Sequence, residues 1–196
     1  MKNLFLKDLY IIKQWVFLIP IFLAIALVLN NGTVSLVALA LSIAISIRLI
    51  YNDDKIKGSF IINSLPVTGR EIIISKYIIL NLIIIFIAFS IILIHYITHS
   101  KFPNLCTAIL NLKDILSFIF LSNIICAIII PLYYSINNIN IFLLILLPLF
   151  FSLDPISTYL IPKLNFLNPI SIVLFLLIMY SSMHSSIRLF ESMDIE

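Results

Sequence analysis

Residues 52–77 read NDDKIKGSFIINSLPVTGREIIISKY, a charged and polar segment between two long runs of Ile, Leu and Phe. Elsewhere the apolar residues fall in stretches of about 18 to 22, the length that an α-helix needs to cross a bilayer. The polar segment therefore separates two membrane-spanning helices. It is also the part of the chain best placed to contact a soluble partner.

Composition assigns the protein to a class before any motif does. The 196 residues are 62% hydrophobic and 11% charged, and the mean hydropathy is +1.20. Soluble domains are about 45–50% apolar and about 25% charged, so the sequence predicts an all-α integral membrane protein. Residues 1–196 have room for about six spans as a single transmembrane domain. No length remains for a soluble catalytic domain.

Six hydrophobic segments follow one another along the chain. They cover about residues 15–29, 34–51, 77–97, 115–135, 141–153 and 167–187. With the N-terminus inside, the inner segments hold Lys2, Lys7, Lys13, Arg48, Lys55, Lys57, Arg70, Lys76 and Arg188, and the outer segments hold Lys101, Lys113 and Lys163. This bias places both termini and the loop over 52–76 in the cytoplasm.

The first residues predict a helix that lies along the inner membrane surface and contacts lipid. Lysine and aspartate alternate there with aliphatic residues, which gives a helix a basic side beside an apolar one. The residues of this expected interfacial helix are Lys2, Lys7, Lys13 and Trp15. Trp15 is at the depth where aromatic residues favour the interface. The alternative is that the segment is only the start of the first span.

The polar segment predicts two helices joined by a sharp turn. Asp53 and Asp54 suit a helix N-terminus, so we expect a short helix over 53–63 that carries Phe60. The turn consists of Ser64, Leu65, Pro66 and Val67. The next helix begins with Thr68, Gly69, Arg70 and Glu71, in which Thr68 and Glu71 form a capping box. Such a unit presents an apolar knob to a cytosolic partner; the alternative is a simple tight connection between spans.

At these residues the chain resembles the permease subunits of bacterial ABC exporters of the ABC-2 type, in the branch with the phenol-soluble modulin exporter permeases. The similar residues are Asp53, Asp54, Lys55, Ser64, Leu65, Pro66, Val67, Thr68, Arg70, Glu71, Ile72, Ser75, Lys76 and Tyr77. The resemblance implies an N-terminal interfacial helix, a cytoplasmic coupling helix between spans two and three, and short outer helices between spans five and six. It also implies a second permease subunit, the same or a related chain, and two copies of a separate ATPase in a bacterial cell membrane.

Prolines and small residues add expectations about packing. Pro20, Pro131 and Pro148 lie inside hydrophobic segments, where a missing backbone donor bends a helix. The pair Asp154–Pro155 predicts that the chain leaves the bilayer core there and forms short re-entrant or interfacial helices on the outer side. Ala38, Ser42 and Ser46 line one face of the second span, which favours close packing inside one subunit over a dimer face.

The residues argue against chemistry on this chain. The three glycines are Gly32, Gly58 and Gly69, all in predicted connections, so no glycine-rich loop is present to hold a nucleotide phosphate. His95 and His99 lack an acidic partner, so we expect no metal site. The basic residues lie at helix ends, which fits membrane topology better than nucleic acid. We expect no catalytic residue and no bound cofactor, with ATP and Mg²⁺ held by the partner subunit.

The leading hypothesis is therefore a permease subunit of an ATP-driven exporter for an amphipathic or hydrophobic cargo such as a peptide, an antibiotic or a lipid. The residues expected to contact the ATPase are Asp53, Asp54, Phe60, Ser64, Leu65, Pro66, Val67, Thr68, Arg70 and Glu71. One alternative is a non-transporting immunity or sensor protein that recruits a cytosolic partner. A third is an ion-coupled carrier. The sequence does not give the cargo or the direction of transport. It also leaves open whether the permease forms a homodimer or a heterodimer with a related chain.

Overall fold

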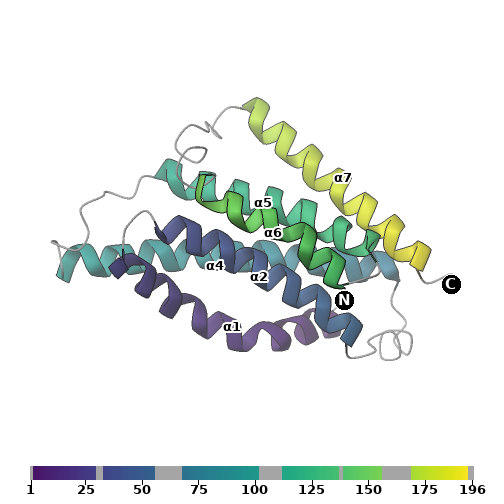
Figure 1. Cartoon of the computed structure of the whole chain (residues 1–196), viewed down its shortest axis with the longest axis horizontal. Helices are drawn as coiled ribbons and strands as arrows, with labels where there is room; N and C mark the ends of the chain where they lie inside the picture. The colour runs from purple at the N-terminus through teal and green to yellow at the C-terminus, as the bar shows by residue number, and fades with distance from the viewer. Residues whose placement is uncertain are drawn as a thin grey trace.

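The computed structural model describes residues 2–29, 33–55, 68–101, 112–136, 139–155 and 169–193. Within these ranges the chain forms six α-helices that lie side by side as a bundle (Figure 1). They are α1 (Lys2–Leu29), α2 (Thr33–Lys55), α4 (Gly69–Lys101), α5 (Leu112–Ser135), α6 (Ile139–Pro155) and α7 (Pro169–Met193). Every predicted hydrophobic segment lies within one of these helices, apart from the first two residues of the sixth. The all-helical prediction is therefore confirmed.

Three helices are long and apolar enough to cross a membrane by themselves: Gly69–Ser100, Lys113–Ser135 and Ser171–Ser192. A bent pair, Phe5–Lys13 and Val16–Ala26, raises the number to four among the described residues. α6 has 17 residues, which at a rise of about 1.5 Å per residue gives about 25 Å, less than a bilayer core of about 30 Å. The apolar part of α2, Leu36–Tyr51, is also short. Six spans thus stay a prediction.

The bend in α1 lies between Lys13 and Val16, about one to two turns before Pro20. The two parts of α1 meet at 44°, and Pro20 has no N–H to donate to the carbonyl of Val16, the residue at which the second part begins. Pro131 and Pro148 also lie inside helices, in α5 and α6. The outer helices predicted between the fifth and sixth spans fall on 156–168, outside the described residues.

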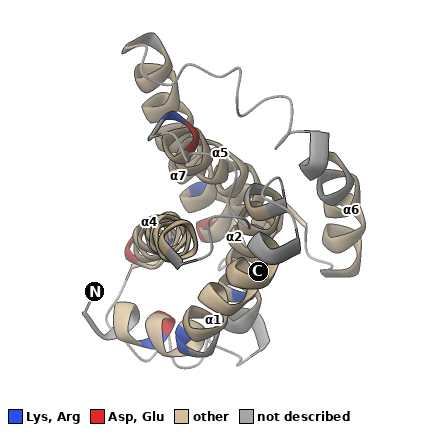
Figure 2. Ribbon diagram, turned by 90° about the vertical axis from the view of Figure 1, so that its left-hand side faces the viewer, with Lys and Arg blue, Asp and Glu red and all other residues tan. Residues whose placement is uncertain are grey.

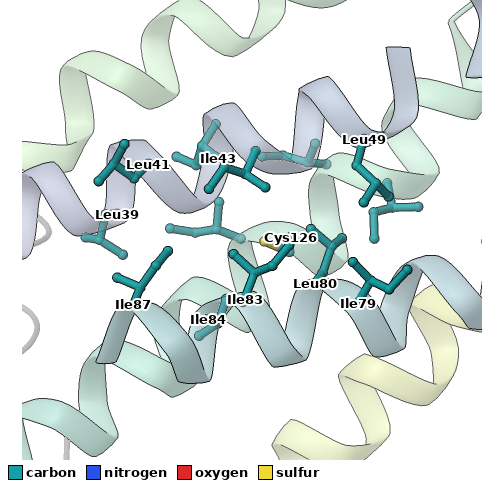
Figure 3. Close-up of a cluster of buried hydrophobic side chains, with 14 of the residues drawn as sticks. Leu39, Leu41, Ile43, Leu49, Ile79, Leu80, Ile83, Ile84, Ile87 and Cys126 are labelled. Carbon is teal, nitrogen blue, oxygen red and sulfur yellow. The ribbon is translucent and has the colours of Figure 1, made fainter. Parts of the chain in front are cut away.

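The helix α4 contacts four of the other described helices. It packs against α1, α2, α5 and α7, while α6 lies at the periphery on α2 and α5 (Figure 2). Aliphatic side chains of α2 and α4 meet in the core, with Cys126 of α5 beside them (Figure 3). The labelled members of this cluster are Leu39, Leu41, Ile43, Leu49, Ile79, Leu80, Ile83, Ile84, Ile87 and Cys126.

The small-residue face of α2 packs inside the subunit. Ala38, Ser42 and Ser46 are at most 1% exposed, and the Ser46 hydroxyl lies 3.0 Å from the sulfur of Cys126 on α5. Ser42 and Ser46 also donate to carbonyls of their own helix, those of Leu39 and Ser42. Small side chains allow α2 and α5 to approach closely, as helices in membranes commonly do.

Ser46→Leu should lower the free energy of unfolding by about 1–3 kcal/mol, because the larger side chain overpacks the contact between α2 and α5. Ala44→Leu on the same helix is the matched control, since Ala44 is only half-buried. Thermal unfolding in detergent measures both variants. Equal losses for the two would contradict the assignment of this face to the α2–α5 interface.

Candidate functional site

The predicted capping box is present at the start of α4. The backbone N–H of Thr68 donates to Oε2 of Glu71 at 3.1 Å, and the N–H of Glu71 faces the Thr68 hydroxyl oxygen at 3.4 Å. The N–H groups of Glu71 and Ile72 also donate to the Thr68 carbonyl, at 2.9 and 3.2 Å. The N–H groups of Thr68 and Glu71, which a helix start leaves without a helical partner, are thus hydrogen-bonded. The cap fixes the point at which the polar segment enters α4.

α4 begins against the end of α7. A Cβ atom on Gly69 would lie 2.9 Å from Cδ1 of Phe190 and 3.6 Å from Cγ of Glu191. Gly69 is the first residue of the helix, so its role is to leave space for the Phe190 ring. The predicted helix start at Thr68–Gly69 is confirmed, whereas the contact with Phe190 could not be predicted, because the sequence does not reveal which helix lies beside Gly69.

A line of aromatic rings continues from this contact into α5 and α6. Phe190 meets Tyr134 edge-on, with ring centroids 5.5 Å apart. Tyr134 and Tyr133 are 5.8 Å apart, and Tyr133 and Phe142 of α6 are 5.0 Å apart, both edge-on. Edge-to-face pairs at these separations are favourable beyond the area they bury. We call the four rings of Phe190, Tyr134, Tyr133 and Phe142 the aromatic line, which begins at the contact of Phe190 with Gly69.

A buried lysine joins α4 to the end of α2. Lys76 is 1% exposed. One of its contacts is a hydrogen bond from Nζ to the carbonyl of Leu49, at 3.4 Å. Burying an ammonium group costs free energy unless it is hydrogen-bonded, so this position holds α2 and α4 together. The sequence places Lys76 on the cytoplasmic side of the membrane but does not indicate that its side chain is buried between helices.

The two aspartates of the polar segment require a correction. Asp53 and Asp54 lie in the last turn of α2, which continues to Lys55, and they do not open a new helix. The reason is that the residues from Asn52 to Lys55 include no glycine or proline that would interrupt the hydrogen bonds of α2. Phe60 and the predicted turn over 64–67 lie outside the described residues, whereas Arg70 is exposed beside the cap.

The N-terminal part of α1 turns its apolar side outward. Leu6 is 53% and Tyr10 is 78% exposed, whereas Asp8 is 1% exposed. Nζ of Lys7 lies 3.5 Å from Oδ1 of Asp8, and Lys13 is exposed. Lys2 and Trp15 belong to the same helix. An outward face of Leu and Tyr with a lysine beside it suits the boundary between lipid and water.

The histidines of α4 are a pair rather than a cluster. The ring centroids of His95 and His99 are 6.3 Å apart. Across the described ranges, no group of three His, Cys, Asp or Glu residues is arranged to hold a metal ion.

Comparison with known proteins adds one finding. A family model described as "ABC-2 family transporter protein" matches residues 3–191, nearly the whole chain. No curated protein and no solved structure matches the chain.

Thr68→Ala should lower the free energy of unfolding by about 1 kcal/mol, because the N-cap oxygen is lost at the start of α4. Thr68→Ser keeps that oxygen and is the control. Thermal unfolding in detergent compares the two, and an equal shift for both would show that the hydroxyl is not the stabilising group.

Gly69→Val should lower the free energy of unfolding by about 1–3 kcal/mol, because the branched side chain collides with the Phe190 ring. Adding Phe190→Ala should restore part of the loss, since it removes the ring. A double variant that is destabilised by the sum of the two single effects would contradict the contact between α4 and α7.

Proposed function

Because the chain belongs to the ABC-2 family of transporter proteins, we propose that it is the membrane-spanning permease subunit of an ATP-driven exporter. Members of this family are membrane components of transporters and are not themselves catalytic. In this proposal the chain works with two copies of a separate ATPase and with a second permease subunit in the bacterial cell membrane. The cargo is amphipathic or hydrophobic, such as a peptide, an antibiotic or a lipid.

Six spans with both termini in the cytoplasm are part of this proposal. α4, α5 and α7 meet the requirements for a span, and the bent α1 supplies a fourth. α2 and α6 complete the set if their ends extend into the headgroup region. α1 and α4 begin, and α2 and α7 end, at the same end of the bundle (Figure 1). The excess of lysine and arginine toward that end of the helices supports a cytoplasmic position.

The observation that carries the proposal is the attachment of the α4 start to other helices. The predicted turn over 64–67 precedes Thr68 directly in the chain, and Gly69 lies against Phe190 of α7. From there the aromatic line reaches α5 and α6. A force applied to the turn by a moving ATPase would therefore act on three helices besides α4. This supports the turn as the coupling element.

The sequence supports a separate ATPase. Its three glycines are too widely spaced for a nucleotide-binding loop, so ATP and Mg²⁺ would bind the partner. The ATPase contact would consist of the residues predicted from the sequence, now with Asp53 and Asp54 at the end of α2 instead of on a helix of their own.

A groove between α5 and α7 supports an amphipathic cargo. It is a shallow, open groove of about 470 Å³ that combines apolar with hydroxyl side chains. Its lining includes Ile128, Leu132, Ser135, Ile178, Ser181 and Ser185. Such a surface accepts a molecule with both an apolar part and hydrogen-bonding groups.

A tagged chain purified from native membranes should carry an ATPase with nucleotide-binding motifs, identified by mass spectrometry. Leu65→Asp should reduce its recovery at least tenfold, because a charge in the turn disrupts an apolar contact. Leu164→Asp, in the connection predicted on the outer side, is the matched control and should leave recovery unchanged. Recovery of no ATPase with the unmodified chain, or equal recovery with Leu65→Asp, would contradict the proposal.

A further inference from the structure

One backbone carbonyl of α5, beside α7, lacks its usual helical donor. Pro131 has no N–H, so it cannot donate to the carbonyl of Ala127, four residues earlier. The hydroxyl of Ser182 on α7 donates to this carbonyl at 2.5 Å. Ser182 is 8% exposed and Ala127 is 2% exposed, so water does not supply the bond. A proline in one helix is thus matched by a serine in another.

Two more hydroxyl groups extend this contact to α4. The Tyr77 oxygen lies 2.5 Å from Oγ of Ser182 and 3.1 Å from Oγ of Ser186. Ser182 has a single hydroxyl hydrogen, which goes to Ala127, so Tyr77 must donate to Ser182. Tyr77 has then used its own hydrogen, so Ser186 must donate to Tyr77. The bonds therefore run in one direction, from Ser186 through Tyr77 and Ser182 to the carbonyl of Ala127.

Neighbouring serines of α7 behave differently. The hydroxyls of Ser181 and Ser185 donate to carbonyls of their own helix, those of Ile178 and Ser181. Ser182 and Ser186 instead reach α5 and α4. The hydroxyl chain of Ser186, Tyr77, Ser182 and the Ala127 carbonyl is therefore a specific arrangement and not a general property of serine in this helix.

The hydroxyl chain lies in register with the contact at the start of α4. Tyr77 follows Gly69 by eight residues, and Ser182 precedes Phe190 by eight residues on the helix that runs the other way. The helices α4 and α7 thus meet at two points about 12 Å apart along their axes. A second groove of about 470 Å³, lined by Tyr77, Asn81, Met179, Tyr180 and other residues of α4 and α7, lies beside the hydroxyl chain.

We propose that Tyr77 and Ser182 are positioning residues of the transport cycle, and that the bond between them is the releasable contact through which α4 separates from the pair α5–α7. Ser182 keeps the Ala127 carbonyl satisfied when Tyr77 leaves, so separation strands no backbone group in the membrane. Tyr77 in turn gives up two hydroxyl partners, Ser182 and Ser186, both on α7. The transport role rests on the proposed function, whereas the releasable contact does not.

The first test uses unfolding of the purified chain in detergent. Ser182→Ala strands the Ala127 carbonyl and should lower the Tm by about 5 °C. Adding Pro131→Ala should recover at least half of that loss, because residue 131 regains an N–H for the carbonyl. Ser185→Ala is the control and should shift the Tm by less than about 1 °C. A double variant no more stable than Ser182→Ala would overturn the assignment.

The second test measures the separation itself in nanodiscs. Spin labels are attached to cysteines that replace the exposed Ile85 of α4 and Leu177 of α7. Cys106→Ser removes one of the two native thiols, and the other, on Cys126, is buried. With Tyr77 unchanged, the two labels should be separated by one main distance. Tyr77→Phe should add a second population with a longer distance between the labels. A distance distribution that Tyr77→Phe leaves unchanged would overturn the releasable contact, since a purely structural hydroxyl would alter stability alone.

The third test uses the complex with its ATPase. Tyr77→Phe should leave recovery of the ATPase unchanged and raise the ATP hydrolysed per cargo molecule at least twofold. An unchanged ratio would overturn the transport role of Tyr77. Recovery of no ATPase with the unmodified chain would contradict the proposed function, and the unfolding and distance measurements would still decide the releasable contact.

Discussion

In the hydrocarbon core of a membrane, every backbone N–H and C=O group must find its partner inside the protein, because no water is available. A proline within a span breaks this rule locally, and the structure must compensate. At Pro131 the compensation comes from another helix, through the hydroxyl of Ser182. The requirement to satisfy one carbonyl thus fixes the position of α7 against α5 and, through Tyr77, that of α4 against both.

The same three helices meet again at the start of α4. The capping box ends the polar segment at a defined point, and Gly69 allows Phe190 to reach the helix start. The hydroxyl chain consists of hydrogen bonds, whereas the aromatic line consists of edge-on ring contacts. Aromatic rings stay packed when helices shift slightly, whereas a hydroxyl bond is either made or exchanged. A membrane protein that must move while staying folded can use the first as a joint and the second as a contact that opens.

Much of this could be predicted from local patterns. The Thr68–Glu71 capping box depends on spacing within one helix start, and it was predicted with its roles. The helices themselves follow from apolar stretches of sufficient length. The expectation that a new helix starts at Asp53 was wrong, because α2 continues through Asp53 and Asp54 to Lys55; residues 56–63 of that predicted helix lie outside the described residues. The roles of Gly69, Ser182 and Lys76 could not be predicted, because each is set by a residue on another helix, and one sequence does not reveal which helices are neighbours. Only Pro131 gave a sign, since a proline in a span implies a free carbonyl.

The central claim is that the turn over 64–67 contacts a moving ATPase and that α4 passes this motion to α5, α6 and α7. A photoreactive amino acid at position 66, activated in native membranes, tests it most directly. The account predicts a covalent product with a chain that carries nucleotide-binding motifs, and a product yield that changes when ATP is added. Products with lipid alone, or with a soluble protein that binds no nucleotide, would contradict it.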